Sequence, residues 1–207
     1  MIQAPAPALV LASASASRRA MLEGAGLRFE ALAAFVDEAS IKEACQAEDI
    51  PAVEAALMLA DAKAQRIAAK RPEALVIGGD QLLTCVIEGK LRWFDKPEGL
   101  DGARAHLRAL RGQRHELVTA TVAWRHGQRI WHDVTTPRLT MRELSDKFIE
   151  DYLAIEGEVI CASVGAYRVE GPGIQLFSRV EGEHSAILGL PLLPLLGFLR
   201  QHGVLEG

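Results

Sequence analysis

The sequence has 207 residues, of which 49% are hydrophobic and 24% charged, and these shares are ordinary for a soluble globular protein. Its formal net charge of −4 argues against a surface built to hold nucleic acid, although a small basic pocket for phosphates is compatible with it. Its three cysteines lack CxxC spacing and predict neither a disulfide framework nor a zinc site. We therefore expect a reducing, cytoplasmic setting.

Membrane association and secretion are not expected from the apolar segments. The apolar stretch 186–199 has only the length of a core helix and contains two prolines, so it is too short to span a bilayer. The first residues superficially resemble a secretory leader, but the first basic residue is Arg18, and such leaders carry positive charge near their start. Because no internal repeat or long linker divides the chain, we expect a single domain over residues 1–207.

A serine-rich segment follows the first predicted strand. Residues 7–12 favour a strand, and SASASRR over residues 13–19 precedes a helical pattern that ends at Gly26. The serines therefore lie at a strand-to-helix junction, where free N–H groups and the helix dipole favour an anion. Their hydroxyls and a guanidinium would form a phosphate cradle without the glycines of a P-loop. The plainer alternative is that the serines only cap the helix.

An acidic pair and a lysine come next. Residues 27–35 predict a second strand, which ends at an acidic pair that includes Glu38. Pro51 opens a long alanine-rich helix that runs to about Lys70, and Lys63 lies on it. A lysine on a helix is usually solvated, so a role for Lys63 needs support from elsewhere.

The segment 74–97 is the centre of the predicted site. The apolar run 74–77 predicts a buried strand that ends at two glycines, where the backbone can turn sharply or approach a ligand, and Asp80 follows them. Residues 82–87 predict another strand, and a hairpin turn then returns the chain to Lys96 on a stiff Lys-Pro dipeptide. One hairpin thus brings an acid and a base to one sheet edge, which suits a metal-bound polyphosphate. The alternative is a surface turn with an ordinary ion pair.

The remainder of the chain predicts alternating helices and strands. Helices are expected over about 100–110, 145–155 and 186–202, and strands over 117–124, 129–136 and, as a strand or tight crossing, 159–164. Glu170 lies beside a rigid Gly-Pro-Gly turn, which either holds it against a ligand or leaves it in water. The alternation implies an α/β fold with a mixed sheet. The histidines show no paired ligand spacing, so a zinc hydrolase is not expected.

Seven motifs in this order resemble the Maf family of nucleotide pyrophosphatases (Maf/Ham1-like). They are LASASASRR, VDEA, LADAKAQ, VIGGDQ, FDKPEG, YRVEGPGIQLFSRVEG and ILGLPLLPLLGFLR. The resemblance covers nearly the whole chain and implies an elongated mixed β-sheet flanked by helices, with two lobes around a substrate cleft. It also implies a cytoplasmic, metal-dependent hydrolase, often a homodimer, that cleaves a nucleoside triphosphate between its α and β phosphates.

The resemblance assigns roles residue by residue. The matching residues, in chain order, are Ser13, Arg18, Glu38, Lys63, Asp80 and Lys96. Ser13 and Arg18 match the phosphate-binding signature, and Asp80 the catalytic aspartate. Asp80 and Glu38 would hold Mg²⁺ or Mn²⁺ and orient or deprotonate the attacking water. The three basic residues would neutralise charge on the triphosphate and on the leaving pyrophosphate.

Narrower features concern the nucleotide. Gln81 and Glu170 resemble the 7-methyl-GTP pyrophosphatase branch, and a carboxylate can accept two hydrogen bonds from the N1–H and N2–H₂ edge of guanine. The chain departs from the family's usual Ser-Pro-Arg-Arg at its N-terminal motif, where Ser17 stands at a position associated with base choice. Two alternatives are a dTTP/UTP pyrophosphatase and a non-catalytic, nucleotide-binding regulator of septum formation, a process to which family members are linked.

Overall fold

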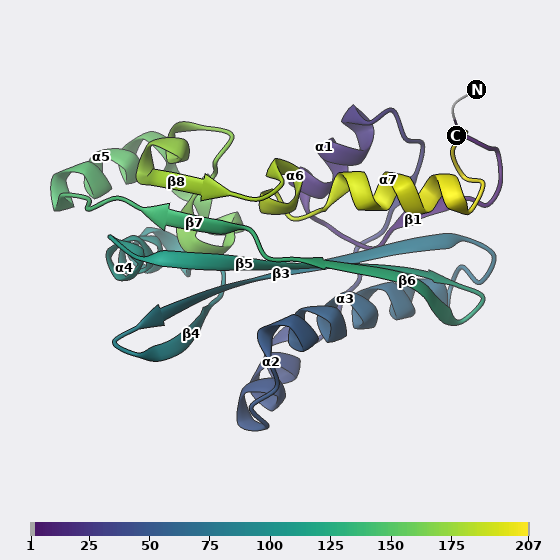
Figure 1. The fold of residues 1–207 in the computed structure, drawn as a ribbon, viewed down its shortest axis with the longest axis horizontal. Coiled ribbons are helices and arrows are strands. Elements are labelled where there is room, and N and C mark those ends of the chain that lie inside the picture. Colours follow the sequence, from purple (N-terminus) through teal and green to yellow (C-terminus); the bar gives the residue numbers. More distant parts are fainter. Residues whose placement is uncertain (1–2, 207) are drawn as a thin grey trace. The chain divides into compact units, whose positions relative to one another are not determined.

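The computed structural model describes residues 3–206, which form a mixed α/β fold (Figure 1). The strands are β1 (Leu9–Leu11), β2 (Glu30–Ala31), β3 (Leu75–Ile87), β4 (Lys90–Phe94), β5 (Arg114–Arg125), β6 (Gln128–Thr135), β7 (Arg138–Met141) and β8 (Phe177–Glu181). The α-helices are α1 (Ala16–Gly24), α2 (Glu38–Ala47), α3 (Ala52–Ala68), α4 (Gly99–Leu110), α5 (Asp146–Glu156), α6 (His184–Ile187) and α7 (Leu192–Gln201). The predicted α/β class with a mixed sheet is confirmed.

The described residues build one open sheet of eight strands. Six of them follow the order β2-β1-β3-β5-β7-β8, while β4 pairs with β3 and β6 with β5. The chain divides into two compact units: residues 3–81, 119–135 and 183–206 belong to the first, and residues 82–118 and 136–182 to the second. Strands β3 and β5 contribute residues to both units. The predicted substrate cleft between two lobes stays a prediction.

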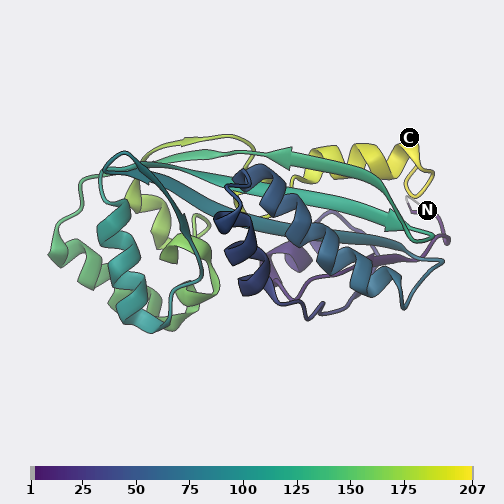
Figure 2. The same cartoon turned by 90° about the horizontal axis from the view of Figure 1, so that it is seen from below.

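In the first unit, β1 pairs in parallel with both β2 and β3, and helices cover both faces of these strands (Figures 1 and 2). Two consecutive glycines of β3 demonstrate this, because successive strand residues point to opposite faces. A Cβ on Gly78 would lie 2.5 Å from the backbone oxygen of Ala60 in α3, whereas one on Gly79 would lie 3.3 Å from Nε of Arg18 in α1. The expected strand end at these glycines is wrong: β3 continues through them, and they permit close packing of the two helices.

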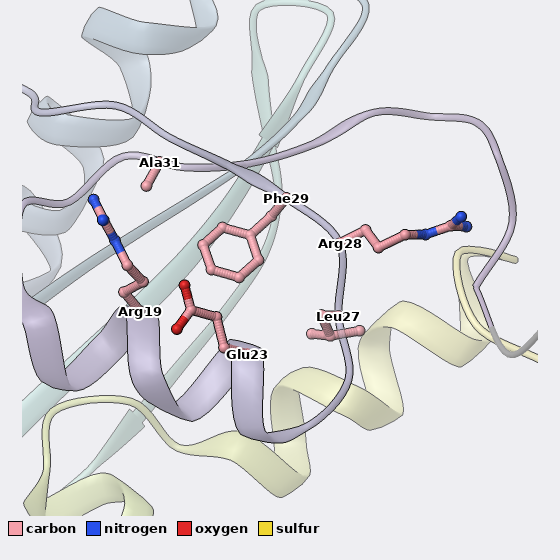
Figure 3. Close-up of a pocket in the computed structure, with 6 residues that line it drawn as sticks. All are labelled: Arg19, Glu23, Leu27, Arg28, Phe29 and Ala31. Atoms are coloured by element: carbon pink, nitrogen blue, oxygen red, sulfur yellow. The ribbon is translucent and has the colours of Figure 1, made fainter.

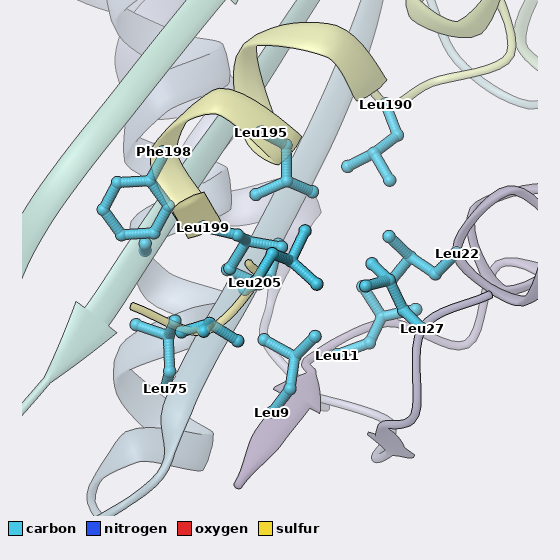
Figure 4. Packing of buried hydrophobic residues seen from close by; sticks show 13 residues of the cluster. Leu9, Leu11, Leu22, Leu27, Leu75, Leu190, Leu195, Phe198, Leu199 and Leu205 are labelled. Carbon is cyan, nitrogen blue, oxygen red and sulfur yellow. The ribbon is translucent and has the colours of Figure 1, made fainter. Parts of the chain in front are cut away.

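The apolar core of the first unit lies between β1, β3 and α7 (Figure 4). Its buried members include Leu9, Leu11, Leu75, Leu195, Phe198 and Leu199. Trp131 of β6 stacks on Phe198, with ring centroids 4.9 Å apart. Because each fully buried leucine contributes roughly 2 kcal/mol to stability, this core anchors α7 and, with it, the α6–α7 connection that reaches the candidate site.

The second unit combines the β4, β7 and β8 strands with α4, α5 and three short 3₁₀ helices, η1 (Gly157–Ala162), η2 (Val164–Ala166) and η3 (Pro172–Leu176). Helix α4 packs against α5, η1 and η2. A buried polar pair lies within this unit: Nε2 of His115 is 2.8 Å from the hydroxyl of Tyr167, and Phe177 packs against both rings.

Several predicted elements differ from the structure. The strand predicted over 27–35 is reduced to the two residues of β2, and the strand or crossing predicted over 159–164 is helix η1 and the start of η2. The short strands β7 and β8 and the helix α2 were missed, because most residues of β8 and α2 are exposed and carry little apolar pattern. The predicted Pro-broken C-terminal helix is two helices, α6 and α7. Within residues 3–206, no helix combines the length and the apolar character needed to cross a membrane.

Candidate active site

Asp80 lies inside β3 and not at the strand end that the sequence predicted. Its side chain points to the α3 face of the strand, and only 4% of the residue is exposed. There Nζ of Lys63 donates a hydrogen bond to Oδ1 of Asp80 at 2.5 Å. A carboxylate buried at this depth needs such a partner, since an unpaired charge in a protein interior is strongly destabilising.

Lys63 joins Asp80 to a second carboxylate. Lys63 is 8% exposed, so it is not the solvated lysine that is usual on a helix. Its Nζ also lies 2.8 Å from Oε1 of Glu38, whose side chain is 42% exposed. Glu38 begins α2, and this helix start is fixed by Asp37, whose carboxylate accepts hydrogen bonds from the backbone N–H (3.1 Å) and hydroxyl (2.8 Å) of Ser40. These two bonds also lower the pKa of Asp37.

The serine-rich segment positions Arg18. The Ser15 hydroxyl accepts a hydrogen bond from the Arg18 backbone N–H and thereby caps α1, whereas Ser13 Oγ accepts from the backbone N–H of Ser15 at 3.2 Å and from Nη1 of Arg18 at 3.3 Å. Nε of Arg18 donates to the carbonyl of Gly189 at 2.7 Å. Burial lowers the pKa of Arg18, while the charges of Asp80 and Glu38 act in the opposite direction. The serines therefore both cap the helix and orient the half-buried Arg18.

Two cations and two anions thus meet in the first unit: Arg18, Lys63, Asp80 and Glu38. The two carboxylates offer the oxygen ligands that a hard divalent cation prefers. Within residues 3–206, Oδ1 is the only side-chain oxygen of Asp80 that accepts a hydrogen bond. No group of three or more His, Cys, Asp or Glu side chains in the described chain is arranged to hold a metal ion. A pair of carboxylates fits Mg²⁺ or Mn²⁺, which usually complete their coordination with water and substrate phosphates.

Gln81 points to the opposite face from Asp80, and its amide nitrogen has three hydrogen-bond acceptors around it. Its Nε2 donates to Thr119 Oγ1 at 2.7 Å and to the carbonyls of Ala186 and Ile187 at 3.0 and 3.1 Å. The Thr119 hydroxyl in turn donates to the Ala186 carbonyl at 3.0 Å. The amide nitrogen is therefore saturated, and only Oε1 is left to accept a hydrogen bond. The sequence did not single out Thr119, because threonine in a strand pattern is an ordinary β-former.

Three further residues were predicted to belong to the site, namely Ser17, Lys96 and Glu170. Ser17 is half-buried on α1, next to Arg18. Lys96, after β4, and Glu170, between η2 and η3, are exposed residues of the second unit. Their participation in the site stays a prediction.

The two adjacent arginines of the serine-rich segment point into different surroundings. Arg19 lines an open pocket of about 520 Å³ with Glu23, Leu27, Arg28, Phe29 and Ala31. In this pocket Glu23 points toward the Phe29 ring, while Arg28 extends away from it (Figure 3). None of the predicted site residues lines this pocket, so it is distinct from the Arg18 cluster.

Comparison with known proteins gives a consistent result. The family model described as "Maf-like protein" matches residues 8–202. The chain is 54% identical over 197 residues to a protein of Granulibacter bethesdensis named nucleoside triphosphate pyrophosphatase, covering 95% of this chain and 98% of that protein. A Rhodospirillum rubrum protein of the same name is 51% identical, with 96% of each chain covered. A Rhizobium meliloti protein named 7-methyl-GTP pyrophosphatase is 46% identical, covering 97% of this chain and 98% of that protein.

Proposed function

Because the chain belongs to the Maf family, we propose that it is a nucleoside triphosphate pyrophosphatase, which releases a nucleoside monophosphate and pyrophosphate. The names of relatives that are 54% and 51% identical over nearly their whole length support this reaction class. The observation that carries the proposal is the contact of Lys63 with both Asp80 and Glu38, 2.5 and 2.8 Å away. Such a cluster combines acceptors for water or metal with donors for phosphate oxygens.

Each side chain of the cluster has a role in this proposal. Asp80 accepts a hydrogen bond from the attacking water, orients it and takes its proton. Lys63 fixes the orientation of both carboxylates, and Arg18, held by Ser13 and Gly189, donates to phosphate oxygens on which negative charge develops. Lys96 neutralises the departing pyrophosphate. Mg²⁺ or Mn²⁺, held by Asp80 and Glu38, supplies additional charge neutralisation when bound.

We further propose a modified guanine nucleotide, such as 7-methyl-GTP, as the substrate. Two relatives, both 46% identical, carry that name. The carboxylate of Glu170 is suited to the two N–H donors of a guanine edge, and Oε1 of Gln81 is available for one more donor. The alternative is that the protein catalyses the same reaction but prefers dTTP or UTP as its substrate. We also propose that the protein acts in the cytoplasm and that it forms a homodimer. Light scattering after size-exclusion chromatography tests the homodimer through its molar mass.

The test is pyrophosphate release from 7-methyl-GTP, GTP, dTTP, UTP and CTP, with and without Mg²⁺ or Mn²⁺. The wild-type chain is expected to prefer 7-methyl-GTP and to need the metal, whereas Asp80→Asn is expected to lose turnover by a factor of about 10³. Preference for dTTP or UTP would overturn only the substrate assignment. Binding of nucleotide without any release would instead support a non-catalytic regulator of septum formation.

A further inference from the structure

A second polar cluster lies on the α6–α7 face of the first unit. Strands β5 and β6 pair Thr119 with Thr135 and Thr121 with Asp133, and directly opposed residues of antiparallel strands point to the same face. Thr119 bonds to the Ala186 carbonyl of α6, which identifies that face. Gln81, the neighbour of Asp80 on β3, bonds to Thr119 as well. Since successive strand residues alternate, Asp80 faces the opposite side.

Three buried oxygen atoms of this cluster have no hydrogen-bond partner within the described chain. They are Oγ1 of Thr121, Oγ1 of Thr135 and Oδ2 of Asp133. Thr121 is fully buried, with 0% of the residue exposed. Buried polar atoms are nearly always paired, so three unpaired oxygens on neighbouring positions of two strands indicate that they contact something other than protein.

The cluster also carries excess negative charge. Burial and then the charge of Glu183 raise the pKa of Asp133, and the exposed His132 acts in the opposite direction. Oε1 of Glu183 accepts hydrogen bonds from the hydroxyl of Ser185 and the backbone N–H of Leu193. Within residues 3–206 neither carboxylate forms an ion pair with a lysine or arginine, and His132 is the one basic group whose charge acts on Asp133. The site thus places two half-buried carboxylates near each other without a lysine or arginine partner.

We propose that Thr121, Thr135, Asp133 and Glu183 bind a hard divalent cation such as Ca²⁺ or Mg²⁺, at a site separate from Asp80 and Glu38. The available ligands are all oxygens, two of them from hydroxyls and the others from carboxylates, which is the donor set of such ions. A water molecule alone would satisfy the three oxygens but would not offset the repulsion between the carboxylates of Asp133 and Glu183. A cation satisfies both requirements.

Terbium luminescence provides a direct test, because Tb³⁺ occupies oxygen-ligand sites and emits when a nearby tryptophan is excited. Trp131 is paired with Ala123 on the same face, two residues from Asp133, and serves as the antenna. The measurement uses full-length Asp80→Asn protein, in which the proposed metal site at Asp80 and Glu38 has lost one carboxylate. We expect saturable, tryptophan-sensitised emission that Ca²⁺ displaces. Trp131→Phe should lose the sensitised emission but retain the gain in melting temperature that Ca²⁺ produces.

Adding Asp133→Asn should weaken Tb³⁺ binding at least tenfold, whereas adding Glu54→Gln, an exposed carboxylate on α3, should leave it unchanged. If Asp133→Asn fails to fold, Thr121→Val and Thr121→Ser replace it, with weaker binding expected only for valine. Emission unaffected by Asp133→Asn, or no sensitised emission at all, would overturn the proposal. Because binding is measured in a catalytically impaired background, its failure would leave the proposed pyrophosphatase reaction untouched.

Discussion

Lys63 and Asp80 form a buried ion pair in which Nζ lies 2.5 Å from Oδ1, and the pair connects α3 to the middle of β3. The packing of these two elements depends on Gly78, where a Cβ would lie 2.5 Å from the backbone oxygen of Ala60 and 2.7 Å from Cβ of Ala64. A side chain at position 78 would therefore push α3 away from β3. The glycine and the ion pair are two parts of one arrangement, because moving the helix would also move Lys63.

Lys63→Met is expected to remove most activity and to reduce stability. Methionine has a similar length but cannot compensate Asp80 and Glu38, and breaking a buried pair costs about 3 kcal/mol. The rate of pyrophosphate release should fall by a factor of about 10²–10³. Urea unfolding and single-turnover kinetics measure the two effects. Lys70→Met, which changes an exposed lysine just after α3, should alter neither; wild-type turnover in Lys63→Met would exclude a role for this ammonium.

The two glycines of β3 are expected to respond differently to alanine. Gly78→Ala should destabilise the protein by about 3 kcal/mol, because the close atoms include backbone that cannot move aside. At Gly79 the nearest atom is Nε of Arg18 at 3.3 Å, and this flexible side chain can shift. Gly79→Ala should therefore cost about 1 kcal/mol or less. Equal melting temperatures of the two variants would contradict this packing argument.

Thr119→Val is expected to loosen Gln81. The substitution keeps the side-chain shape but removes an acceptor from Nε2 of Gln81 and a donor to the Ala186 carbonyl, with a loss of about 1–2 kcal/mol in stability. If Oε1 of Gln81 contacts the substrate, KM should rise several-fold with little change in kcat. Thr119→Ser retains the hydroxyl and should restore both the stability and the KM of the wild type. A change in stability without any change in KM would restrict Thr119 to a structural role.

Sequence patterns predicted the elements that carry regular apolar periodicity, such as α3, α4 and the first part of β3. They did not predict β8, whose pattern is mostly exposed, nor the continuity of β3 through two glycines, which depends on how closely α3 and α1 approach. The cluster itself was predicted by family resemblance, since nothing local distinguishes a buried Lys63 from a solvated lysine. Thr119 and the α6 carbonyls were missed because they join positions more than 60 residues apart.

Stability is expected to decrease in acid because of His115. Burial lowers the pKa of this imidazole to about 4, below the value of about 6.5 in an unfolded chain. The folded state therefore binds the proton less readily than the unfolded state. The resulting stability is fully present above pH 6.5 and is lost progressively as the pH falls toward 4, with a total of about 3 kcal/mol.

His115→Gln removes the titrating group while keeping a polar side chain near the Tyr167 hydroxyl. The variant should be less stable than the wild type at pH 7.5, since the 2.8 Å contact with Tyr167 is altered. The difference in the free energy of unfolding between the two proteins should shrink as the pH is lowered from 6.5 to 4.5. The reason is that only the wild type has an imidazole at position 115, which must stay neutral in the folded state. Urea unfolding at several pH values measures this difference. The contributions of all other titrating groups to the pH dependence cancel, because both proteins contain them. A constant difference across that range would show that His115 has a similar pKa in both states.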